Sequence, residues 1–201
     1  MSHAHVRLLM LVVVVIAAVS LATTGDRVNW ILEECVVLIA IPCVLHFSRR
    51  AGLTTTLVVA ITLQMLVITQ GAHSTYEHAI LGTWIEHLFD MHRNPWDRVG
   101  HLFQGIVPAL TAWEVLRRYV KLRPSPLLRY LAISVAMGIS AVYEIIEMIL
   151  GLIGADATRA FVNTNGDILD PQWDMTMALI GSMLAVLCLS RWQERKLRVL
   201  A

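Results

Sequence analysis

Long, predominantly apolar runs are the feature that most restricts how this chain folds. Residues 8–22 read LLMLVVVVIAAVSLA, and residues 127–143 read LLRYLAISVAMGISAVY. A helix needs about 20 apolar residues to cross the roughly 30 Å hydrocarbon core of a bilayer. Charged residues make up 15% of the chain, against about a quarter in a typical soluble domain. The expected fold class is therefore all-α: a polytopic integral membrane protein in which residues 1–201 form a single helical-bundle domain.

The distribution of apolar residues predicts a bundle of six transmembrane helices with a long outer loop between the third and the fourth. The predicted spans are 7–23, 28–48, 53–70, 98–119, 129–153 and 173–191. The first span resembles a signal peptide, because Ser-Leu-Ala at 20–22 suits a cleavage site. Its basic leader contains Arg7 alone among Lys and Arg, and this favours an uncleaved anchor.

The loops alternate in charge, and cytoplasmic loops of membrane proteins are enriched in Lys and Arg. With the N-terminus in the cytoplasm, the inner segments hold 12 of the 16 basic residues, and the outer side holds 13 of the 15 acidic ones. We therefore expect both termini in the cytoplasm and the polar chemistry on the outer side. No nucleic-acid partner is expected, because the net charge is +1 and no basic run alternates with aromatic residues.

Ionisable and polar residues enter the outer parts of the last three predicted spans at a spacing of three or four. Side chains at this spacing share one face of a helix. They are Asp97, His101 and Gln104 on the fourth span, Glu144 and Glu147 on the fifth, and Asp170 and Asp174 on the sixth. Ionisable residues inside a membrane normally face the bundle interior and find partners there. We expect these side chains to converge in one pocket just beneath the outer surface.

Carboxylates and an imidazole suit a divalent metal such as Mg, Mn or Zn. Such a metal activates water or polarises a phosphoryl oxygen. The expected metal ligands are His101, Glu144, Glu147, Asp170 and Asp174. The expected catalytic residues are Glu144, Glu147, His101, Asp97 and Arg98, with Arg98 holding a phosphate.

Two other interpretations of the same residues remain open. Without a metal, the paired carboxyl groups can serve as an acid and a base. In a purely structural interpretation the polar groups tie helices together. Asp170 is then an N-cap, and Asp97 interacts with the dipole of its own helix.

Four segments of the chain, in order, resemble the YjdF-like family of bacterial inner-membrane proteins. They are GAHSTYEH, NPWDRVGHLFQGIVPAL, SAVYEIIEM and TNGDILDPQWDMTMALIG, starting at residues 71, 94, 140 and 164. The pattern is more distantly similar to VanZ-like proteins. The resemblance implies a multi-pass protein of the bacterial inner (cytoplasmic) membrane, whose site faces the periplasm.

The resemblance also implies which further residues belong to the site. We assign substrate binding to His73, Tyr76, Gln104, Tyr143, Asp167 and Trp173. An Arg often precedes Glu114 in the family, and Trp113 stands there in this chain, which argues against a role for Glu114. The resemblance implies no reaction, because the family has no established function.

The first hypothesis is an enzyme: a metal- or acid–base-dependent hydrolase or transferase that acts on a lipid or lipid-linked head group at the outer leaflet. The expected partners are membrane lipids and a lipid-linked or envelope substrate. One alternative is a cation- or lipid-binding or transport module, which requires polar residues beyond mid-membrane. The inner halves of the last three spans hold few, chiefly Glu114, so the enzyme ranks first. The other alternative is a non-catalytic accessory protein linked to the envelope or to antibiotic resistance.

Overall fold

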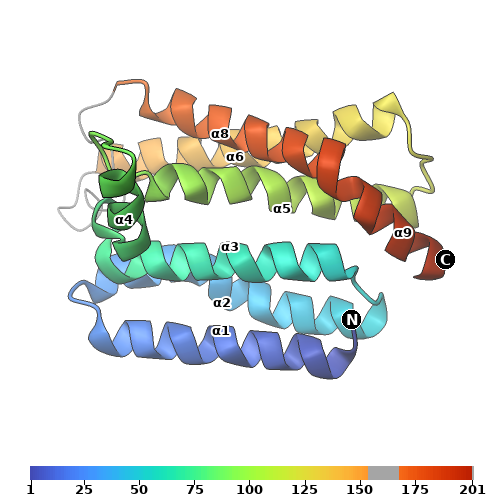
Figure 1. Ribbon diagram of the computed structural model, residues 1–201, viewed down its shortest axis with the longest axis horizontal. Coiled ribbons are helices and arrows are strands. Elements are labelled where there is room, and N and C mark those ends of the chain that lie inside the picture. Colours follow the sequence, from blue (N-terminus) through green and yellow to red (C-terminus); the bar gives the residue numbers. More distant parts are fainter. Residues whose placement is uncertain (154–167, 201) are drawn as a thin grey trace.

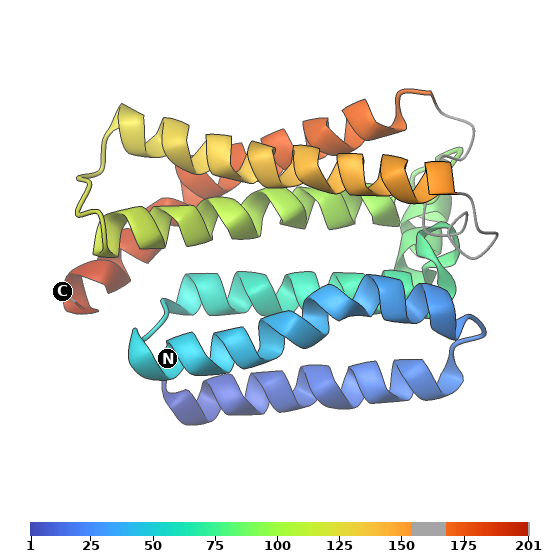
Figure 2. The same ribbon diagram turned by 180° about the vertical axis from the view of Figure 1, so that it is seen from behind.

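The computed structural model describes residues 1–153 and 168–200, which are helical apart from short turns and loops. One group of helices comprises α1 (His3–Thr23), α2 (Arg27–Arg50) and α3 (Thr55–Ser74). The second group comprises α5 (Trp96–Arg118), α6 (Pro126–Ile153) and α8 (Asp170–Leu184). All of these helices run lengthwise, and α3 packs against α5 where the groups meet (Figures 1 and 2). The all-α membrane architecture is therefore confirmed.

Within the described residues, five helical segments are long and apolar enough to cross a membrane. They are His3–Thr23, Arg27–Arg50, Thr55–Ser74, Pro126–Leu152 and Asp170–Arg198. The last of these joins α8 through the π-helical turn η2 (Ala185–Leu189) to α9 (Ser190–Leu200). Helix α5 has 23 residues and lies beside the others, but its polar residues leave it less apolar than these five. The count of six spans therefore stays a prediction.

Helices α5 and α8 pack backbone against backbone at two glycines. A Cβ atom on Gly105 of α5 would lie 1.9 Å from the carbonyl oxygen of Ala178 on α8. A Cβ atom on Gly181 of α8 would lie 2.0 Å from the carbonyl oxygen of Leu102 on α5. Small residues permit such close helix contacts in membrane proteins. The first turns of both helices, which carry the predicted site residues, are consequently held side by side.

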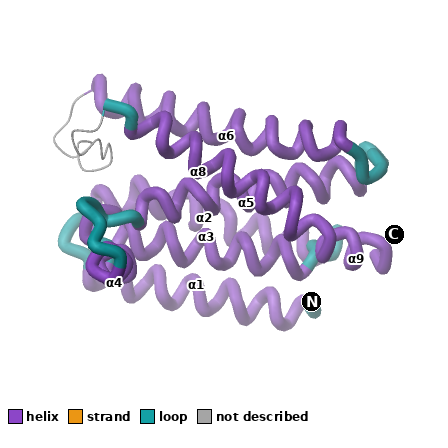
Figure 3. The backbone as a smooth tube through the Cα atoms, turned by 45° about the horizontal axis from the view of Figure 1, so that its top comes forward, coloured by secondary structure: helices purple, strands orange, loops and turns teal. Residues whose placement is uncertain are grey.

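The segment between α3 and α5 contains short helices rather than one long loop. These are η1 (Tyr76–His78) and α4 (Ile80–Leu88), and α4 lies across one end of the bundle (Figure 3). Helix α4 exposes Trp84 and Leu88, as expected of a helix at a membrane surface. Helix α4 ends at Leu88. Asp90, two residues further on, has a φ of 50°, a left-handed conformation that terminates helices.

Both termini lie at the opposite end of the bundle (Figure 1). Buried polar side chains surround Glu114 there. The Glu114 carboxylate accepts hydrogen bonds from the Thr54 hydroxyl at 2.6 Å and the Gln193 amide at 3.0 Å. It also pairs with Arg118 at 2.8 Å. Glu114, to which the sequence assigned no role, therefore joins α5 to the start of α3 and to α9.

Candidate functional site

Ionisable side chains gather inside the bundle at the end that α4 covers. We call this group the polar cluster. Its members come from α2, the loop before α5, α5, α6 and α8. They are Glu33, Glu34, Arg93, Asp97, Arg98, His101, Glu144, Glu147, Asp170 and Asp174. The tertiary structure thus brings together the site residues predicted on the last three spans.

His101 lies at the centre of the polar cluster and is buried. Its Nε2 atom is 3.5 Å from Oδ1 of Asp97 and 3.5 Å from Oδ1 of Asp174. N–H···O hydrogen bonds are typically about 2.7–3.2 Å long, so both contacts are too long for a good hydrogen bond. The three side chains can each offer one ligand atom, and these atoms lie within 4.8 Å of one another. Asp97, His101 and Asp174 are therefore the described residues best placed to hold a metal ion.

Gln104 orients the His101 ring. Nδ1 of His101 is 2.7 Å from Oε1 of Gln104. With the amide oxygen as acceptor, Nδ1 carries a proton. Nε2 faces the two aspartates, toward which it can donate when protonated or act as a ligand when a metal ion is bound.

Two arginines hold the aspartates of the polar cluster. Arg98 donates hydrogen bonds to Asp170 and Asp174 on α8. Arg93, which the sequence analysis did not single out, donates to Asp170 at 2.6 Å and to Asp97 at 3.1 Å. The N-cap interpretation of Asp170 is wrong: Leu169 is the N-cap, and the Asp170 carboxylate is paired with both arginines. The Arg98 guanidinium, expected to hold a phosphate, is engaged by carboxylates.

Helix α6 contributes Tyr143, Glu144 and Glu147. The Tyr143 ring meets the His101 ring edge to face, with centroids 5.8 Å apart. Oε1 of the buried Glu144 lies 3.6 Å from Nδ1 of His101, and neither carboxyl oxygen makes a hydrogen bond within the described part of the chain. Glu147 lines the cavity described below. Glu144 therefore lies against the histidine, and Glu147 faces the cavity that His101 also lines.

Helix α2 adds two buried acids to the polar cluster. The sequence alone does not decide whether they belong to the site or lie on the surface. Glu34 accepts a hydrogen bond from the Thr69 hydroxyl at 2.8 Å, and Glu33 is hydrogen-bonded to the Tyr76 phenol. Burial, together with the nearby Glu33, raises the pKa of the Tyr76 phenol well above its usual value, so Tyr76 remains a proton donor. The sequence feature that could have identified Glu33 and Glu34 as site residues is a pair of adjacent acids inside an apolar run.

The other predicted site residues lie in different surroundings. His73 lies with its Nδ1 3.4 Å from the Ser20 hydroxyl, between α3 and α1. Trp173 is exposed on the surface of α8. Asp167 lies outside the described residues.

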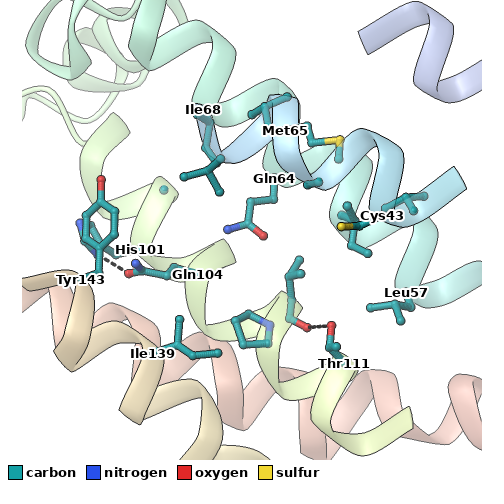
Figure 4. A pocket seen from close by; sticks show the side chains of 18 of the residues that line it. Cys43, Leu57, Gln64, Met65, Ile68, His101, Gln104, Thr111, Ile139 and Tyr143 are labelled. Carbon is teal, nitrogen blue, oxygen red and sulfur yellow. Dashed lines mark hydrogen bonds between the residues drawn. The ribbon is translucent and has the colours of Figure 1, made fainter. Parts of the chain in front are cut away.

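A cavity of about 750 Å³ extends from the polar cluster between α2 and α3 on one side and α5 and α6 on the other. Tyr76, Asp97, His101, Tyr143 and Glu147 line its polar end. Figure 4 shows the His101–Gln104 hydrogen bond on one wall and Gln64 on another. The polar cluster is therefore accessible through this cavity.

These features define the class of protein: a helical membrane protein with a buried carboxylate–imidazole cluster at one end of its bundle. The chain belongs to the family described as "Predicted membrane protein (DUF2238)", whose model matches residues 5–195. It is 36% identical over 173 residues to the inner membrane protein YjdF of Escherichia coli (strain K12), covering 86% of this chain and 83% of that protein. No solved structure matches this chain.

The comparisons confirm the predicted YjdF-like family and a multi-pass location in the inner membrane. They supply no reaction, substrate or cofactor. The more distant likeness to VanZ-like proteins stays a prediction.

Proposed function

We propose that this protein is a divalent-metal-dependent hydrolase or transferase that acts on a lipid or lipid-linked head group at the outer leaflet. The observation that carries the proposal is the position of His101 Nε2, 3.5 Å from one carboxylate oxygen of Asp97 and of Asp174. Around a tetrahedral zinc ion with bonds of about 2.0–2.2 Å, two ligand atoms are about 3.4 Å apart. The separation of His101 from each aspartate therefore suits shared coordination of one ion, and all three ligand atoms lie within 4.8 Å of one another.

The charge of the polar cluster also favours a cation. Its acidic side chains outnumber the two guanidiniums of Arg93 and Arg98 and the imidazole of His101. The acids are Glu33, Glu34, Asp97, Glu144, Glu147, Asp170 and Asp174. Buried acids that lack a basic partner are protonated or bound to a cation, because an unpaired charge in a medium of low dielectric constant is costly. A divalent ion would let several of these acids stay ionised.

Each neighbour then has a definite role. Gln104 fixes the His101 tautomer, Arg98 positions Asp174, and Glu147 serves as the base that faces the cavity. The bound ion would polarise a phosphoryl oxygen of the head group or activate water. In a hydrolysis, the water oxygen attacks the head-group phosphorus and the bond from phosphorus to the leaving oxygen breaks. One proton of that water passes through Glu147 to the leaving oxygen.

We place the polar cluster at the periplasmic face. The excess of Lys and Arg at the opposite end supports this orientation through the positive-inside rule. In this arrangement α5 also crosses the membrane, which brings the number of crossings to six. Its length and its position beside the apolar helices support that count, as does the presence of both termini at one end of the bundle (Figure 1).

Elemental analysis of protein purified in mild detergent tests the metal. We expect a stoichiometric divalent ion in the parent protein, and its loss in Asp97→Asn and Asp174→Asn. Asp90→Asn is the matched control, because Asp90 is an exposed acid at the same end and Asn tolerates its left-handed conformation. Thermal unfolding in the same detergent establishes that each variant is folded.

The catalytic base has its own test. Glu147→Gln should keep the ion and the fold while abolishing release of head group from vesicle lipids. A parent protein without any stoichiometric ion would overturn the metal-dependent proposal and leave the acid–base and accessory roles.

A transport function is the second candidate, because the cavity continues inward from the polar cluster. Gln64, Gln104 and Thr111 line its middle, and Glu114 and Arg118 line its far end. Reconstituted vesicles containing a pH-sensitive or metal-sensitive dye distinguish the candidates. Ion flux that Glu114→Gln abolishes would favour transport over hydrolysis.

A further inference from the structure

The cavity combines a polar end with a long apolar body. Between Gln104 and Val115 on α5, a length of roughly 16 Å at a helical rise of about 1.5 Å per residue, the lining is mainly apolar, with Gln64, Thr111 and Glu114 as polar exceptions. Its apolar wall includes Val37, Ala40, Leu57, Ile61, Val107 and Ile139. Burial of apolar surface stabilises a bound apolar ligand, so such a wall adds no binding free energy for a small polar substrate.

The cavity wall is also incomplete on one side. Helix α2 packs against α1 and α3, whereas α6 packs against α5 and α8, so the edges of α2 and α6 face each other across the cavity. The lining residues on these edges remain exposed: Val36 and Phe47 at 50% and Ile139 at 46%. In a bilayer this side faces the hydrocarbon core, because α2 and α6 are membrane-spanning helices. The opening is therefore lateral and leads into lipid.

The far end of the cavity is polar. Arg118, which lines this end, donates hydrogen bonds to the carbonyl oxygens of Ala51 and Gly52 and pairs with Glu114. The apolar surroundings of a hydrocarbon chain that enters from the side therefore end at these polar groups.

We propose that the cavity binds one hydrocarbon chain of a membrane lipid that enters between α2 and α6 and places its head group at the polar cluster. The placement of the head group rests on the proposed function; the binding of the chain rests on the shape and lining of the cavity. The substrate class is then a membrane lipid taken directly from the bilayer, and the cavity wall selects its chain.

Photo-crosslinking tests this proposal on the full chain. The protein is reconstituted in vesicles of phosphatidylethanolamine and phosphatidylglycerol that contain a phosphatidylglycerol with a diazirine in its acyl chain. We expect crosslinks on Leu57 and Met65 of α3, which line the cavity and are otherwise buried in the bundle. Exposed residues of α1 such as Leu11 should be labelled by bulk lipid in every variant.

Two variants narrow the cavity, and one serves as the control. Ala40→Trp should reduce labelling of Leu57 and Met65 several-fold, and Val107→Phe should do the same from the opposite wall. Ile39→Trp is the matched control, because the neighbouring Ile39 side chain is 66% exposed and does not line the cavity. If Ala40→Trp does not fold, Val107→Phe and the labelling pattern of the parent protein still decide.

The outcomes separate this inference from the proposed function. Labelling of Leu57 and Met65 in a parent protein that binds no stoichiometric ion supports chain binding and overturns the metal-dependent activity. Labelling that persists in Asp97→Asn shows that chain binding does not depend on the ion. Absence of labelling at Leu57 and Met65 in a protein that binds its ion overturns chain binding alone. Labelling that is equal in the parent protein and in folded Ala40→Trp and Val107→Phe also overturns chain binding.

Discussion

Nε2 of His101 on α5 lies 3.5 Å from Oδ1 of Asp174 on α8, and both side chains are buried. The two residues come from predicted spans that are separated along the chain by the whole of α6. Their approach depends on the close packing of α5 and α8 and on Arg98, which pairs with Asp174.

Gln104 should control metal affinity without binding the ion. Removing the amide in Gln104→Ala frees the His101 ring to rotate and change tautomer, so we expect metal affinity to fall roughly 10- to 100-fold. Calorimetric titration of metal-stripped protein measures the change. Gln64→Ala is the control, because Gln64 lines the other wall of the cavity (Figure 4). Equal affinities for the two variants would contradict a positioning role for Gln104.

The contact between α5 and α8 should tolerate no added methyl group. Gly105→Ala and Gly181→Ala each place a Cβ atom about 2 Å from a backbone carbonyl oxygen, so the helices must separate. We expect a destabilisation of about 1–3 kcal/mol, typical of overpacked interiors, together with weaker metal binding. Gly138→Ala on α6 is the control, because nothing lies within 4 Å of the position that the added Cβ atom would take, and alanine favours helix. Unfolding in mixed micelles measures all three.

Loss of Arg98 should leave Asp174 without its guanidinium partner and Asp170 with Arg93 alone. Arg98→Met keeps most of the apolar side chain but removes this charge, and breaking a buried ion pair costs about 3–5 kcal/mol. Combining Arg98→Met with Asp170→Asn should restore part of this stability. The exposed Arg27, at the same end of the bundle, supplies the control Arg27→Met. Additive effects in the double-mutant cycle would show that Arg98 and Asp170 are not coupled.

The orientation of the bundle can be tested with single cysteines in a background that lacks Cys35, Cys43 and Cys188. In intact spheroplasts, Asp90→Cys should react with a membrane-impermeant maleimide, since we place its end of the bundle in the periplasm. Ser125→Cys, in the loop between α5 and α6, should react only after the cells are lysed. The reverse pattern would put the polar cluster in the cytoplasm. Reaction of both in spheroplasts would show that α5 does not cross the membrane.

Local sequence determined the helices and the side of each helix that carries polar residues. The apolar runs predict membrane helices because a chain in lipid must satisfy its backbone hydrogen bonds within each helix. The spacing of Asp97, His101 and Gln104 predicts a shared face, since residues three or four apart are neighbours on a helix. Local sequence could not predict the start of α4 or the role of Glu114, because both depend on contacts with distant segments.

Tertiary structure alone decided which polar residues meet. The sequence grouped His101 with Glu144, Glu147, Asp170 and Asp174, whereas the ligand atoms that come closest to His101 Nε2 belong to Asp97 and Asp174. That choice depends on the rotation of α8 about its axis and on its distance from α5. Both are fixed by backbone contacts at two glycines, and no local pattern encodes them. Likewise, the cavity exists because α2 and α6 do not close against each other, a property of how the helices assemble rather than of either helix by itself.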